Sequence, residues 1–123
     1  MILDSNVIIR LLHRSVPSQT KLAEEFFKKI EAGQKTGEIS ILVIDETIYV
    51  LSAYYKIQRS DFIPDLIKIL SIKGVSVIEA KKEVIMEILN KMVGNNIDFT
   101  DYYLVSLRPK SDILSFDNDL KKI

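Results

Sequence analysis

Short, largely apolar runs alternate with stretches whose apolar residues recur every three to four positions, and this alternation constrains the fold more than any other feature. The runs are ISILVI (39–44), VSVIEA (75–80) and DILSF (112–116), and a two-residue run, Ile2–Leu3, opens the chain. Strands that are buried on both faces of a parallel sheet have such unbroken apolar sequences. The pattern predicts an α/β fold, a three-layer α/β/α sandwich around a mostly parallel central sheet.

The stretches between these runs have apolar residues at helical spacing and predict helices. Pro17 opens one of them and Gly33 marks its end. Asp45 and Asp98 are predicted N-caps, because a short side-chain acceptor satisfies the first free backbone N–H groups of a helix. The predicted helices cover 5–13, 17–33, 46–56, 60–72, 84–92 and 102–107, with a short polar helical turn at 118–122.

The chain has 123 residues, enough for a sizeable core, and we expect a single domain over 1–123. Its composition, 47% hydrophobic and 28% charged, is typical of a globular protein. Cysteine is absent, which excludes a disulfide framework, a thiolate nucleophile and a cysteine-bound zinc. The N-terminus does not resemble a signal peptide, and no apolar run approaches about 18 residues, so we expect a cytoplasmic protein without a membrane span.

The 17 basic and 17 acidic side chains give a net charge of zero. Proteins that hold nucleic acid mainly through bulk electrostatics are usually basic. If this chain handles nucleic acid, local patches or bound metal ions must supply the attraction. His13 is the only histidine, which argues against RNA cleavage by a histidine pair, and no glycine-rich stretch fits a phosphate-binding loop.

Acidic residues follow the predicted strands at the points where those strands end. Asp4 follows the first strand, and Glu46 opens the helix after the second. Asp117 follows the last strand directly, with Asp119 two residues on, and Asp101 lies in the first turn of its own helix. The carboxyl ends of parallel strands share one edge of the sheet, the usual ligand site of such folds. We therefore expect these acids to converge at that edge.

Converging carboxylates need a counter-ion. Two of them about 4 Å apart repel by roughly 4 kcal/mol at a surface-like effective dielectric. A protein relieves this repulsion by protonating one acid or by binding a cation, and an all-oxygen site suits Mg²⁺ or Mn²⁺. Such an ion keeps open positions for water and for a substrate phosphate, and it orients and acidifies a water for attack on phosphorus.

Each acid also has a purely structural interpretation. Asp4 can cap the helix that follows it, and Glu46 can interact with a helix dipole. Asp101 can complete a capping-box-like turn, and Asp117 with Asp119 can form the polar turn after a strand. A non-catalytic interaction module, whose acidic pocket receives basic partner side chains, is therefore a second interpretation of the same residues.

Four segments, in this order and spacing, resemble a PIN domain, and most closely the VapC-type toxins of prokaryotic toxin–antitoxin pairs. They are ILDSNVIIRLL at the start, DETIYVLSA in the middle, IDFTDYYLVSL late in the chain and ILSFDNDLKKI at the end. Together they span almost the whole chain. The C-terminus comes soon after the last predicted strand, where relatives often carry one more.

The resemblance implies a metal-dependent endoribonuclease that hydrolyses RNA phosphodiester bonds with Mg²⁺ or Mn²⁺ and leaves 5′-phosphate and 3′-hydroxyl ends. The residues that match the family's acidic quartet, and its frequent additional acid, are Asp4, Glu46, Asp101, Asp117 and Asp119. They would hold the metal, the first four as catalytic residues. Asn6 matches the asparagine that orients the first acid, and Ser115 matches the small hydroxyl residue before the fourth.

The resemblance also implies partners: an RNA substrate, a protein antitoxin that lays a helix or tail across the groove, and a second copy of the chain in a homodimer. The aromatic and apolar residues that would suit a dimer interface are Tyr49, Tyr54, Tyr55, Ile57 and Phe62. The candidate RNA contacts are Arg10, His13 and Arg14, and more distantly Lys56, Arg59, Arg108 and Lys110. A nuclease of ribosomal RNA processing or RNA turnover would use the same acids, so that function stays open beside the toxin.

Overall fold

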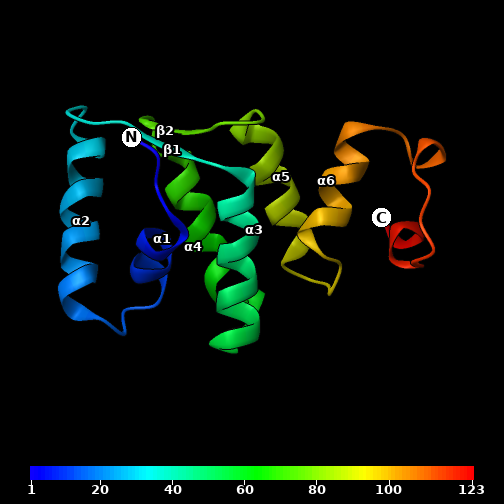
Figure 1. The fold of residues 1–123 in the computed structure, drawn as a ribbon, viewed down its shortest axis with the longest axis horizontal. Coiled ribbons are helices and arrows are strands. Elements are labelled where there is room, and N and C mark those ends of the chain that lie inside the picture. The colour runs from blue at the N-terminus through cyan, green and yellow to red at the C-terminus, as the bar shows by residue number, and fades with distance from the viewer.

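The computed structural model describes residues 1–123 and shows an α/β protein in which a small parallel sheet runs across one end of a group of helices (Figure 1). The elements are α1 (Ser5–Leu12), α2 (Pro17–Glu31), β1 (Gly37–Ile39), α3 (Ile41–Tyr49), a π-helical turn (Val50–Tyr54), α4 (Arg59–Ser71), β2 (Val75–Val77), α5 (Lys82–Met92), α6 (Phe99–Leu107) and 3₁₀ turns at Lys110–Asp112 and Asp119–Lys122. None of the helices has the length and apolar character needed to cross a membrane.

The sheet has two strands, and Gly37 of β1 allows the first segment of the chain to lie close beside it. Strands β1 and β2 pair in parallel, with Gly37 opposite Val75, and Ile2 adds a single parallel bridge to Glu38. A Cβ atom at Gly37 would lie 2.9 Å from a methyl group of Leu3, so a larger residue could not take this place without displacing that side chain. The α/β class is confirmed, with a sheet much smaller than the sequence predicts.

The predicted strand 39–44 is wrong beyond its first residue. The chain leaves β1 at Ile39 and enters α3 at Ile41, with Ser40 at the N-cap. The Glu79 carboxylate, distant in sequence, accepts hydrogen bonds from the Ser40 hydroxyl at 2.5 Å and the Ile41 N–H at 2.8 Å. These bonds satisfy the start of a helix, and the apolar run then covers the core with Ile41 and Ile44 at helical spacing.

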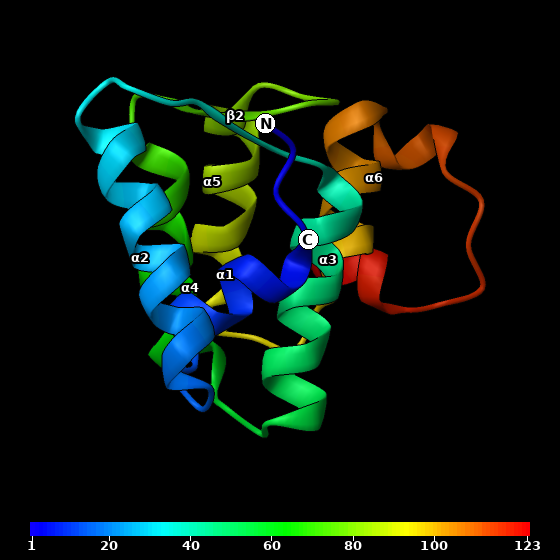
Figure 2. The ribbon, with the colours of Figure 1, turned by 60° about the vertical axis from the view of Figure 1, so that its left-hand side comes forward.

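The predicted strand 112–116 is also wrong in this structure. Lys110–Asp112 forms a 3₁₀ turn and the residues after it pair with no strand. Leu114 is 89% exposed and Phe116 is 99% exposed. The segment loops outward beyond α6 in both views (Figures 1 and 2). Since no neighbouring strand lies beside it, its apolar side chains have no surface to cover.

The helices are predicted more successfully than the strands. The structure confirms the starts of α1 and α2, and α4, α5 and α6 begin within a few residues of the predicted ones. The hydrophobic core is one cluster of 24 buried residues that ends, along the chain, at Tyr102. Beyond it only Leu120 is buried, at 7% exposure. Residues 1–107 therefore contain nearly all of the packing, and the C-terminal segment after Leu107 is held by few apolar contacts.

Candidate metal centre

Three carboxylates meet where α6 faces the C-terminal segment. Asp101 comes from the first turn of α6, and Asp117 and Asp119 come from the segment that follows it. One oxygen from each carboxylate lies within 4.8 Å of the others. Asp101 and Asp119 are half-buried and Asp117 is exposed. We call these three residues the acidic cluster.

Polar turns fix the two C-terminal members of the acidic cluster. The Asp117 N–H donates to the Ser115 hydroxyl at 3.0 Å, and the Asp119 N–H donates to an Asp117 oxygen at 3.0 Å. Lys122 donates to an Asp119 oxygen at 3.3 Å, an exposed pair that contributes little to stability. Such bonds to N–H groups two residues on are typical of Asx and Ser/Thr turns. They leave a second oxygen of each carboxylate without a hydrogen-bond partner.

The cluster is short of positive charge. The pKa of Asp101 is raised above its ordinary value, first by burial and then by the negative charges of Asp117, Asp98 and Asp119. A raised carboxyl pKa means that the ionised form is held at a free-energy cost. A divalent cation would relieve that cost, and Mg²⁺ and Mn²⁺ prefer the carboxylate oxygens that this donor set offers. The residues present therefore fit such an ion.

A second group of acids lines a groove of 440 Å³ between α3 and the start of α6, which we call the α3–α6 groove. It contains Asp45, Glu46 and Asp98, and Arg59 is its one basic lining residue. The pKa of Asp45 is raised, first by burial and then by the charge of Asp98. Because the charge of Asp98 also raises the pKa of Asp101, these acids and the acidic cluster share one negative region of the molecule.

The sequence assigns Asp45 and Asp98 to helix caps and so misses their place in this groove. Asp98 does occupy the N-cap of α6, although its side chain makes no capping hydrogen bond. The cap predicted at Asp45 is wrong, because α3 begins a turn earlier, after Ser40. When α3 begins after Ser40, helical spacing places Leu42, Asp45 and Tyr49 on one exposed face of the helix. This exposed face is the sequence pattern that indicates the groove.

Asp4 and Glu46 lie outside the acidic cluster. The Asp4 carboxylate accepts a hydrogen bond from the Ser5 N–H at 2.7 Å and thereby caps α1. Glu46 does not open its helix as predicted, and lies instead in the second turn of α3. Asn6 makes no hydrogen bond to Asp4, and it lines an apolar groove instead. Of the five acids that the sequence singles out, the structure brings together the three from the C-terminal half.

The candidate RNA contacts gather around the end of α1 and have partners within the chain. Arg10 donates to the Tyr55 hydroxyl at 3.4 Å. His13 packs on the same Tyr55 ring, with ring centroids 4.1 Å apart. Arg14 forms an exposed ion pair with Glu24 at 2.7 Å. None of the three belongs to the acidic cluster.

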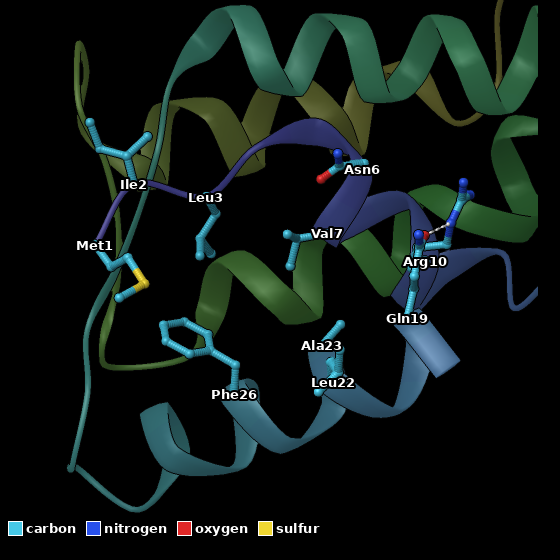
Figure 3. A pocket seen from close by; sticks show the side chains of 10 residues that line it. All are labelled: Met1, Ile2, Leu3, Asn6, Val7, Arg10, Gln19, Leu22, Ala23 and Phe26. Carbon is cyan, nitrogen blue, oxygen red and sulfur yellow. Dashed lines mark hydrogen bonds between the residues drawn. The ribbon is translucent and has the colours of Figure 1, made fainter. Parts of the chain in front are cut away.

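An apolar groove of 380 Å³ separates the first segment of the chain from α2 (Figure 3). Leu3 and Val7 form one wall, and Ala23 and Phe26 of α2 form the other. Met1 and Leu22, which also line it, are 68% and 66% exposed. At one end Arg10 donates to the Gln19 side chain at 2.7 Å. The groove is concave and mostly apolar, features that suit binding of a peptide segment.

Comparison with known families identifies the class of protein. The sequence model of the PIN domain family, described as "PIN domain", matches residues 1–123. The chain therefore belongs to the PIN domain family, whose members are typically metal-dependent nucleases. No curated protein and no solved structure matches the chain.

Proposed function

We propose that the protein is an endoribonuclease that hydrolyses RNA phosphodiester bonds with the help of Mg²⁺ or Mn²⁺. One observation carries the proposal: Asp101, Asp117 and Asp119 bring carboxylate oxygens within 4.8 Å of one another in a chain of the PIN domain family. Asp117 and Asp119 also take part in turns, but three negative charges this close together oppose folding unless a cation joins them. The cluster is an apt donor set for a divalent cation.

The chain's own residues hold and orient the reacting groups. The three carboxylates of the acidic cluster would hold the ion, with Ser115 fixing the backbone before Asp117. When bound, the ion supplies a polarised water as nucleophile and positive charge against the charge that develops on the phosphate. Desolvation around Asp101 strengthens that interaction, because charges attract more strongly where water is excluded.

We further propose that Asp4 and Glu46 complete the acidic site and that Asn6 orients Asp4. This assignment rests on the resemblance to the family. It requires the C-terminal segment to approach α1 and α3 more closely in the catalytic state than it does here. The nearly complete exposure of Leu114 and Phe116 supports such a movement, because closer packing would bury apolar surface that is now in contact with water.

For the RNA we propose contacts with Arg10, His13 and Arg14 at the end of α1. Their present partners are neutral or exposed groups, which a phosphate can displace or share at low cost. Arginine also presents several donors in a geometry that matches phosphate. The positive charges of this region would then bind the phosphates of the RNA backbone, while the carboxylates of the acidic cluster bind the metal.

We propose that the protein acts in the cytoplasm as the toxin of a type II toxin–antitoxin pair. The apolar groove between Leu3 and Phe26 would suit an apolar segment of the antitoxin (Figure 3). An arginine of the antitoxin near the acidic cluster would inhibit by neutralising it. A small reading frame for an antitoxin directly upstream would support this role, and a neighbourhood of ribosomal RNA processing genes would favour the housekeeping alternative.

We also propose a homodimer and a single domain over 1–123 with three α/β/α layers. Among the residues expected at a dimer interface, Tyr49 and Tyr54 are 69% and 75% exposed and remain available. Phe62 is 2% exposed and belongs to the core instead. The exposed tyrosines lie along α3 and its π-helical extension, and Leu42 on α3 is 76% exposed. Light scattering of wild type and Tyr54→Glu tests the interface, and a monomeric wild type would contradict it.

The nuclease is tested by cleavage of a structured RNA in Mn²⁺, in EDTA, and by Asp101→Asn. We expect 5′-phosphate products from wild type in Mn²⁺ and none in EDTA, with cleavage by Asp101→Asn reduced at least about 100-fold, since even indirect disruption of a metal site costs about 10–100-fold. Asp112→Asn, at an exposed acid of the C-terminal segment outside the cluster, is the matched control and should cleave as wild type does. Full activity in EDTA would contradict the proposal and favour a non-catalytic module.

A further inference from the structure

Arg59, the first residue of α4, points inward rather than toward solvent. Its side chain is 16% exposed, although the sequence groups it with the candidate phosphate contacts. Its guanidinium donates to the carbonyl oxygens of Asn95 and Ile97, each at 2.8 Å, and to that of Met92 at 3.4 Å. A largely buried charge is tolerated only when its donors are satisfied, and here backbone carbonyls satisfy it.

The three carbonyls belong to the end of α5 and to the connection that leads into α6. The same connection is tied at Asn95, whose side-chain amide donates to the Lys91 carbonyl at 2.9 Å and to the Tyr102 hydroxyl at 2.7 Å. The Asn95 side-chain oxygen accepts from the Ile97 N–H at 2.9 Å. Arg59 and Asn95 therefore fix the path of the chain from α5 into the first turn of α6.

That first turn carries the acids. Asp98 is the N-cap of α6 and lies 3.9 Å from the Arg59 guanidinium, and Asp101 lies within the first turn, next to Tyr102 in the sequence. A displacement of the α5–α6 connection would shift Asp101 relative to Asp117 and Asp119, which come from a segment with few packing contacts of its own. The spacing of the acidic cluster thus depends on where α6 begins.

We propose that Arg59 is a positioning residue for the acidic cluster, holding the start of α6 so that Asp101 faces Asp117 and Asp119. The inference rests on the proposed metal site. Nη1 of Arg59 makes all three carbonyl bonds and Nη2 lies 3.9 Å from Asp98, so the single nitrogen of a lysine ammonium can replace only part of this set. Pure electrostatics predicts the opposite behaviour, because loss of a cation beside these acids would strengthen the binding of another cation.

The test compares Arg59→Met and Arg59→Lys with Lys82→Met. Lys82 is the matched control because it is also a half-buried cation that donates to two backbone carbonyls, those of Ile72 and Val75, each at 3.0 Å. Its ammonium makes no hydrogen bond to the α5–α6 connection, so Lys82→Met reports a loss of stability without a loss of positioning. Mn²⁺ affinity is measured by electron paramagnetic resonance below the melting temperature of every variant.

We expect Arg59→Met to weaken Mn²⁺ binding about 10-fold, in line with the effect of residues that orient metal ligands. Arg59→Lys should fall between Arg59→Met and wild type, and Lys82→Met should bind within about twofold of wild type while melting at a lower temperature. Unchanged or tighter Mn²⁺ binding in both Arg59 variants would overturn the proposal. Arg59→Lys alone decides the result if Arg59→Met does not fold.

Hydrogen exchange separates this proposal from the metal site on which it rests. In the metal-free protein, both Arg59 variants should lose protection at the Ile97 amide, which donates to Asn95, and at the Tyr102 amide, which donates to the Asp98 carbonyl, and Lys82→Met should not. If wild type binds no Mn²⁺ but this local loss is seen, the proposed metal site fails and the hold of Arg59 on α6 stands. If protection of the Ile97 and Tyr102 amides is unchanged in both Arg59 variants, Arg59 positions nothing and the inference fails.

Discussion

Acids at two ends of this molecule have opposite electrostatic surroundings. Near the sheet, Asp4 and Glu79 accept hydrogen bonds from the N-termini of α1 and α3, and the pKa of Glu79 is lowered, first by the Ser40 hydroxyl and then by the Ile41 N–H. At the other end, Asp101 makes no such bond and its pKa is raised. The first pair stabilises the fold, whereas ionised Asp101 costs stability. The contrast shows that hydrogen-bond donors favour the ionised form of Glu79, whereas burial and neighbouring acids oppose ionisation of Asp101.

The largest effect that tests this contrast is on RNA cleavage. Asparagine caps a helix as well as aspartate does, so Asp4→Asn keeps the cap of α1 and removes only the charge. We expect Asp4→Asn to cleave RNA at least about 100-fold more slowly than wild type with an unchanged melting temperature, as the proposed role in the metal site requires. Wild-type activity in Asp4→Asn would make Asp4 a cap alone and confine the site to the acidic cluster.

Stability differences between the two ends of the chain should be smaller. Leu120 is 7% exposed, so we expect Leu120→Ala to lower the free energy of unfolding by about 2 kcal/mol. Phe116 is 99% exposed, and Phe116→Ala should change the free energy of unfolding by no more than about 0.5 kcal/mol. Urea denaturation of the metal-free proteins measures both. A loss of about 3 kcal/mol in Phe116→Ala would mean that the segment 112–116 is packed, as the sequence predicts.

A smaller effect on stability separates the contribution of the capping hydrogen bond at Asp4 from that of its negative charge. Asp4→Ala removes the acceptor of the Ser5 N–H and should destabilise the protein by about 1 kcal/mol, whereas Asp4→Asn should not. Thermal denaturation in EDTA is the measurement. Equal stability of Asp4→Ala and wild type would show that the hydrogen bond at α1 contributes nothing to the fold.

The smallest effect is a pair of opposite pH dependences. A lowered pKa means that ionised Glu79 stabilises the fold above the ordinary glutamate pKa, and that this contribution is lost as the pH falls through the lowered value. A raised pKa means that ionisation of Asp101 destabilises the metal-free fold as the pH rises from the ordinary aspartate pKa through the raised value.

Metal-free melting curves of Glu79→Gln and Asp101→Asn therefore should diverge with pH. At about pH 7, Glu79→Gln should melt below wild type and Asp101→Asn above it, and both differences should shrink as the pH falls and the carboxyls become protonated. Shifts in the same direction at about pH 7 would contradict the contrast between the two groups of acids.

The helices were largely predictable from sequence because their signals are local. Pro17 at the start of α2 and the apolar spacing of α5 need no distant partner to be recognised. The start of α3 was not predictable from local sequence, because it depends on Glu79. This residue lies far along the chain and accepts hydrogen bonds from the Ser40 hydroxyl and the Ile41 N–H. An apolar run such as ISILVI fits a buried strand or a buried helical turn equally well, and only the tertiary partner decides.

The sequence predicts the chemistry of the site, a group of converging carboxylates, but only some of the residues that form it. Asp101, Asp117 and Asp119 were all named from the sequence, although the predicted strand before Asp117 is absent. Asp45 and Asp98 were missed because each has a sufficient local explanation as a cap. The inward turn of Arg59 could not be predicted, since no local pattern reveals three carbonyls contributed by another helix and its loop.

The most direct test of the central claim is a melting curve with and without Mn²⁺. An ion that binds the folded state raises its stability by about 2.7 kcal/mol when its concentration is about 100 times the dissociation constant. Wild type and Asp112→Asn should both melt at higher temperature in Mn²⁺, and Asp101→Asn should not. An equal increase in Asp101→Asn, or no increase in wild type at millimolar Mn²⁺, would contradict a metal centre at Asp101, Asp117 and Asp119.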